Sequence, residues 1–112
     1  MVNIEKSYNR GDSYYNMVVK DLSSEDIQDV NSIYTGISEK ELEDSIKVTI
    51  EHSYTGKPFK SEMVVKKGLL PSVLEGVKKK LEIDEFYEYC YVIYQVIQEY
   101  KKCEQTENLY QE

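Results

Sequence analysis

The chain has 112 residues, of which 40% are hydrophobic and 31% charged, and this balance indicates one folded domain that is neither disordered nor embedded in a membrane. Its 21 acidic and 14 basic side chains give a net charge of −7. A field of this sign disfavours nucleic acids and anionic lipids as partners and favours a basic protein.

The first 21 residues predict a β-hairpin. Apolar and polar residues alternate over residues 2–8 and again over 14–21, and residues that favour turns fill positions 9–13. We therefore expect two antiparallel strands joined by a turn.

Two short acidic helices are predicted next. Ser23 is an N-cap with Asp26 in the capping-box position, and helical spacing of apolar residues continues until Gly36. Ser38 and Glu41 repeat the capping signal and predict a second helix over about 39–45. Residues 21–44 hold eight acidic side chains and one lysine, so this region is the most polarised part of the chain.

A second hairpin follows from alternation over residues 46–54 and 59–65, with a turn at 55–58. We expect Tyr54 to lie opposite Phe59, because this register places the apolar residues of both strands on one face. The same register sets Ile50 opposite Met63 and Val48 opposite Val65. The opposite face then carries polar side chains that suit water.

Two amphipathic helices close the chain. Leu70, Leu74, Val77 and Leu81 form one apolar stripe, and Asp84 is the predicted N-cap of a last helix of about 18 residues. The stripe of that helix is broad enough to form the centre of the core, and three tyrosines follow its edge at helical spacing. The stripe consists of Phe86, Cys90, Ile93, Ile97 and Tyr100, and the tyrosines are Tyr87, Tyr91 and Tyr94.

These elements predict an α+β fold in the order ββααββαα. Two antiparallel hairpins form a small sheet, the acidic helices lie between them in sequence, and the C-terminal pair of helices packs on the sheet. We expect one domain over residues 1–103 and a polar, flexible tail over 104–112.

The sequence contains no strong signal for catalysis or for a bound group. Cys90 and Cys103 fall on one predicted helix, too far apart along its axis to form a disulfide. The single histidine, His52, is predicted to face Ser61, but both side chains would point at the core without donors for an oxyanion. We expect His52 to make one hydrogen bond near a strand end. No zinc or calcium spacing is present, and we expect no metal, no cofactor and no enzymatic activity.

In size, acidity and tyrosine content the chain resembles small proteins that inhibit nucleic-acid enzymes, such as phage anti-defence and anti-CRISPR proteins and nuclease-immunity proteins. This resemblance covers no aligned motif. It implies an inhibitor that acts as a nucleic-acid mimic, with carboxylates in the place of phosphates on a basic surface of a partner enzyme. The residues predicted to bind the partner are Glu25, Asp26, Asp29, Tyr34, Glu39, Glu43 and Asp44.

Two other functions fit the same composition. A structural or assembly protein of a mobile element would self-associate through the tyrosine line on the last helix, and an immunity protein would use the acidic helices against a toxin. The opening residues lack the apolar stretch of a secretory signal, so we expect a cytoplasmic protein, present as a monomer or weak dimer.

Overall fold

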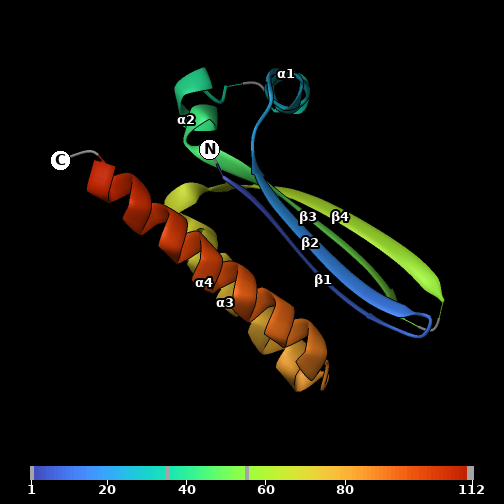
Figure 1. Ribbon diagram of the computed structural model, residues 1–112. Coiled ribbons are helices and arrows are strands. Elements are labelled where there is room, and N and C mark those ends of the chain that lie inside the picture. Colours follow the sequence, from blue (N-terminus) through green and yellow to red (C-terminus); the bar gives the residue numbers. More distant parts are fainter. Residues whose placement is uncertain (1, 35, 55, 111–112) are drawn as a thin grey trace.

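The computed structural model describes residues 2–34, 36–54 and 56–110, and it gives only the backbone of residue 39 and of residues 104–110. Its centre is one antiparallel sheet in the order β1-β2-β3-β4, with both hairpin turns at the same end (Figure 1). The strands are β1 Asn3–Arg10, β2 Ser13–Asp21, β3 Ser45–Tyr54 and β4 Lys57–Lys66.

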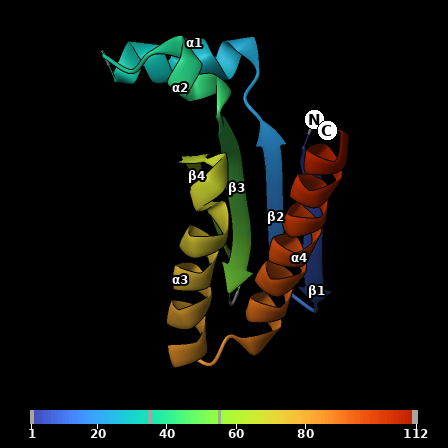
Figure 2. The ribbon, with the colours of Figure 1, turned by 90° about the vertical axis from the view of Figure 1, so that its left-hand side faces the viewer.

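The helices divide into two groups. The helices α3 and α4 run side by side along one face of the sheet, with α4 over β1 and β2, whereas α1 and α2 lie at the end opposite the hairpin turns (Figures 1 and 2). The α+β class with a four-stranded antiparallel sheet is confirmed, and the order departs from ββααββαα by the short 3-10 helix η1 between β4 and α3. The bounds are α1 Ser24–Ile33, α2 Glu39–Glu43, η1 Lys67–Leu69, α3 Leu70–Ile83 and α4 Tyr87–Tyr110.

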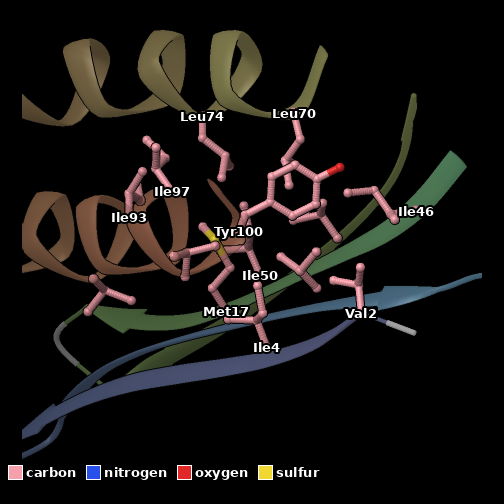
Figure 3. Packing of buried hydrophobic residues seen from close by; sticks show 14 of the residues in the cluster. Val2, Ile4, Met17, Ile46, Ile50, Leu70, Leu74, Ile93, Ile97 and Tyr100 are labelled. Atoms are coloured by element: carbon pink, nitrogen blue, oxygen red, sulfur yellow. The ribbon is translucent and has the colours of Figure 1, made fainter. Parts of the chain in front are cut away.

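The core lies between the sheet and the pair α3 and α4 (Figure 3). Every second residue of β2 and β3 points into it, so that Met17, Ile46 and Val48 are fully buried. From the helices, Leu74 and Ile93 are equally buried, and the apolar stripe predicted for the last helix is the one that packs on the sheet. The long C-terminal helix is therefore the central element of the core.

The register of the second hairpin differs from the predicted one. Tyr54 lies opposite Lys57, Ile50 opposite Ser61 and Val48 opposite Met63. β3 ends at Tyr54 and β4 begins at Lys57, so the strands are separated by two residues instead of the predicted four, which moves every pair along by two positions. An even shift keeps each side chain on its predicted face, so the apolar face is unchanged although the partners are wrong.

The boundary between the last two helices also differs. Asp84 does not begin the last helix but ends α3, and Glu85 follows with a positive φ of 63°. The Glu85 N–H donates to the Glu82 carbonyl at 3.1 Å and the Phe86 N–H to the Leu81 carbonyl at 2.9 Å. These two bonds form a Schellman motif, which ends helices more often with glycine at the left-handed position.

The last helix is longer than predicted. It begins at Tyr87 and its backbone remains helical to Tyr110, so most of the tail expected over 104–112 continues α4. Residues 111–112 lie outside the described residues. Over the part of the chain that the structure describes, no helix is long and apolar enough to cross a membrane.

Candidate partner-binding site

The α1–α2 unit, defined as residues 23–44, contains all seven residues of the predicted site. Its first helix begins as the sequence predicts, because the Ser23 N–H donates to Asp26 Oδ2 at 2.9 Å and the Asp26 N–H donates to Ser23 Oγ at 3.2 Å. At the start of α2, the Ser38 Oγ accepts a hydrogen bond from the Glu41 N–H at 3.2 Å. No residue of α1 is buried, so this helix is held in place by polar contacts instead of by the core.

Lys47 on β3 joins α1 to the sheet. It projects from the face that α3 and α4 leave uncovered, and its Nζ lies 3.0 Å from Asp26 Oδ1 and 3.7 Å from Glu62 Oε2. Partial burial alone would raise the pKa of Asp26, but hydrogen bonds from the Ser23 backbone and from Lys47 outweigh it and lower this pKa to about 2. The hydrogen bond between Lys47 and Asp26 is also the main reason that the pKa of Lys47 is raised. Asp26 is thus a structural residue that faces inward.

The other predicted acidic residues differ from Asp26. Glu39 falls outside the described side chains, and Tyr34 is exposed at the C-cap of α1. Among the described residues no ion pair reaches the four remaining carboxylates, all of which are exposed: Glu25, Asp29, Glu43 and Asp44. Together with Glu41, which is also exposed, the fold gathers five acidic side chains that enter no ion pair among the described residues in one unit at one end of the sheet.

A groove of about 730 Å³ lies between α1 and the uncovered face of β3 and β4. We call it the helix–sheet groove. It combines apolar walls with a charged rim, which is the usual make-up of a recognition site. Its apolar lining includes Val30, Ile33, Tyr34, Ile37, Leu42 and Val64, and its charged lining is Asp26, Asp29, Glu41, Glu62, Lys47 and Lys66.

Sequence reasoning missed the sheet side of this groove. Lys47, Glu62 and Val64 lie on the polar face of the second hairpin, which the alternation predicts to be in contact with water. Nothing in the alternation indicates that α1 overhangs them, because the loop that positions the helix leaves no periodic signal. Val64 was the only available sign, since an apolar side chain at 41% exposure stands out on an otherwise polar face.

The tyrosine line on α4 is exposed, as its place beside the stripe predicted. Tyr87 and Tyr91 are exposed to solvent. The Lys78 Nζ of α3 lies over the ring of Tyr94, 5.8 Å from the ring centre. This surface lies on the helical layer and is separate from the helix–sheet groove.

His52 lies in a cluster of aromatic rings near the hairpin end of the core. Its ring centre is 4.9 Å from that of Phe59 and 6.3 Å from that of Tyr15. The predicted hydrogen bond is absent at Nδ1, which is buried without a partner among the described residues, and Ser61 lies opposite Ile50 instead of opposite His52. The neighbouring Tyr89 hydroxyl donates to the Ser53 carbonyl at 3.2 Å, and the Tyr89 ring is a third aromatic neighbour of His52.

Neither cysteine is in a disulfide. Cys90 is buried and its thiol donates to the Lys78 carbonyl at 3.4 Å, and burial raises the pKa of this thiol. Cys90 is therefore a small core residue, as predicted. Within the described ranges, no cluster of His, Cys, Asp or Glu side chains could hold a metal ion. Comparison with protein-family models, with curated proteins and with solved structures finds no match to this chain.

Proposed function

We propose that the chain is an inhibitor that binds a basic, nucleic-acid-binding enzyme through the α1–α2 unit, whose carboxylates take the place of phosphates. One observation carries this proposal: Glu25, Asp29, Glu43 and Asp44 are exposed without a cation partner among the described residues. Unneutralised charge gathered in one place steers an oppositely charged partner and accelerates encounter at low salt. That the chain is not an enzyme stays a prediction.

The test is charge reversal at positions that the fold does not use. Glu25→Lys combined with Asp29→Lys removes two carboxylates of the site, whereas Asp26 is left intact because it caps α1 and binds Lys47. The matched control is Glu82→Lys with Asp84→Lys, which makes the same change in net charge on exposed residues near the turn between α3 and α4.

Immobilised wild type and both variants are used to capture proteins from a host extract, and the captured enzyme is then tested for duplex DNA binding. We expect the wild type and the control to capture an enzyme and to displace DNA from it, with an affinity that falls as salt rises. The Glu25/Asp29 variant should bind at least tenfold more weakly. An enzyme that binds DNA and the chain together, or that binds this variant equally well, would refute the proposal.

Self-association as an assembly protein is the second candidate, and the exposed line Tyr87, Tyr91 and Tyr94 favours it. Sedimentation over a range of concentrations separates the two functions. A monomer at every concentration would exclude the assembly function, and dimers that dissociate on Tyr91→Ala would support it. An immunity protein would use the same acidic residues, so the nature of the captured enzyme distinguishes it from an inhibitor of host or phage enzymes.

A further inference from the structure

The helix–sheet groove is apolar on both sides and is not filled by any of the residues that the structure describes. Val30 and Ile33 line it from α1, and Val64 lines it from β4. The polar link from Asp26 to Lys47 holds the first turn of α1 at the sheet, while the last turn carries an isoleucine that is 71% exposed. The apolar stripe of α1 therefore faces a space into which another side chain can fit.

Exposed apolar residues gather around this groove. Ile33, Tyr34 and Val64 are all among the exposed large hydrophobic side chains of the described chain, and all three line the same hollow. A contiguous apolar patch bordered by charged residues is typical of a site that binds another molecule. Burial of these side chains on binding would contribute affinity that charge alone does not supply.

The charge of the groove indicates the kind of molecule. Among the described side chains, four carboxylates line it against two lysines, and Lys47 is already bound to Asp26 and Glu62. Asp29 and Glu41 enter no ion pair among the described residues, so the rim attracts cations. Anionic lipid and nucleic acid are disfavoured here, whereas a segment with lysine or arginine beside an apolar residue complements both features.

We propose that the helix–sheet groove receives one large apolar side chain from a lysine- or arginine-rich segment of the partner protein. The side chain inserts between Ile33 of α1 and Val64 of β4, and flanking cations contact Asp29 and Glu41. This inference rests on the proposed function, because it names the binding mode of the same basic partner. Charge brings the partner to the α1–α2 unit, and the desolvated apolar contact lengthens the lifetime of the complex.

Two synthetic peptides test this binding mode. One is rich in lysine with a single central tryptophan, and the other has glutamine in place of that tryptophan. Because the chain itself contains no tryptophan, selective excitation reports only the peptide. We expect the tryptophan peptide to bind about tenfold more tightly, as partial burial of a large side chain implies, and its emission to shift to the blue on binding.

Matched variants locate the contact. Ile33→Ser should remove the advantage of the tryptophan peptide, and Ile83→Ser should leave it unchanged, because Ile83 is 80% exposed at the end of α3, remote from the groove. In the same way Tyr34→Ala should weaken binding and Tyr91→Ala should not, although the two tyrosines are 62% and 61% exposed. Both members of each pair are exposed, so melting temperatures should confirm that all four variants fold.

The outcomes separate this inference from the proposed function. If both peptides bind equally and both are weakened by Glu25→Lys with Asp29→Lys, the groove contact is wrong while the acidic site stands. If neither peptide binds, or charge reversal changes nothing, both proposals are wrong. Loss of binding at Ile83→Ser or Tyr91→Ala would move the contact to the helical layer. A dimer of the chain that dissociates on Ile33→Ser would show a second copy in the groove and would overturn the inference.

Discussion

The helices α1 and α4 both carry an apolar stripe, yet only α4 buries one. Ile93 and Val96 of α4 are fully buried against the sheet, whereas α1 has no buried residue and Ile33 in its last turn is 71% exposed. Helical spacing of apolar residues therefore predicts that a helix forms, but it does not say what the helix packs against. The two helices differ in position: α4 runs along the core-facing side of the sheet, whereas α1 lies at the end of the sheet opposite the hairpin turns (Figures 1 and 2).

Different forces hold the two regions. The core owes its stability to apolar burial, while α1 relies on a capping box and on the ion pair between Asp26 and Lys47. Such polar contacts are worth a few kcal/mol at most. The helix α1 should therefore open locally without unfolding the rest of the molecule.

Replacing an isoleucine by aspartate should have the largest effect in the core and almost none in α1. Ile93→Asp places an unpaired carboxylate in the core and should cost about 4 kcal/mol or more, enough to unfold the domain. Ile33→Asp, on an exposed position, should change the free energy of unfolding by less than about 0.5 kcal/mol. Thermal melting followed by circular dichroism measures both. An Ile93→Asp protein that melts at the wild-type temperature would show that α4 is not central to the core.

Asp26→Asn should weaken α1 and leave the core intact. The substitution removes the charge that Lys47 binds at 3.0 Å and should cost about 1–2 kcal/mol, felt only in the local opening of the helix. Amide hydrogen exchange should accelerate about tenfold or more in α1, with no change in β3. Asp29→Asn is the control, because Asp29 is exposed on the same helix. Equal acceleration in both variants would mean that the ion pair does not hold α1.

The same residue predicts a pH dependence. The pKa of Asp26 is lowered to about 2, so its contribution is present above the ordinary value of 3.8 and is lost as pH falls toward 2. The shift corresponds to about 2 kcal/mol of stabilisation for α1. The protection factors of α1 amides, which exclude the intrinsic pH dependence of exchange, should fall more between pH 5 and pH 3 in the wild type than in Asp26→Asn. The comparison between the two proteins cancels the carboxylates that both share.

The smallest expected effect is a gain in stability. Glu85 adopts a positive φ of 63° after α3, a backbone conformation that is unfavourable for residues other than glycine. Glu85→Gly should raise the free energy of unfolding by up to about 1 kcal/mol, after allowing for the greater freedom of glycine in the unfolded chain. Glu82→Gly, inside the helix, should instead lower it by about 1 kcal/mol. Denaturant titration distinguishes these opposite signs, and equal losses would contradict the assigned backbone strain.

Local signals predicted much of the molecule because they act over a few residues. The capping box of Ser23 and the alternation along β3 and β4 describe contacts between near neighbours, and both appear in the structure. The hairpin register failed because two turn lengths place the same apolar residues on one face, and Asp84 failed because it fits a helix end as well as a helix start. Both errors concern a choice between arrangements of similar local energy.

The sequence by itself determined the strands, the helices, the apolar faces and the acidity of residues 21–44, because each depends on periodicity or composition. Only the tertiary structure decided how the candidate site is built. It turned Asp26 inward to Lys47, left Glu25 and Asp29 in solvent, and made Ile33 and Val64 line the same groove. Asp26 and Lys47 are far apart in the sequence, as are Ile33 and Val64. Which of these residues meet depends on where the loops place α1 against the sheet, and no local pattern encodes that placement.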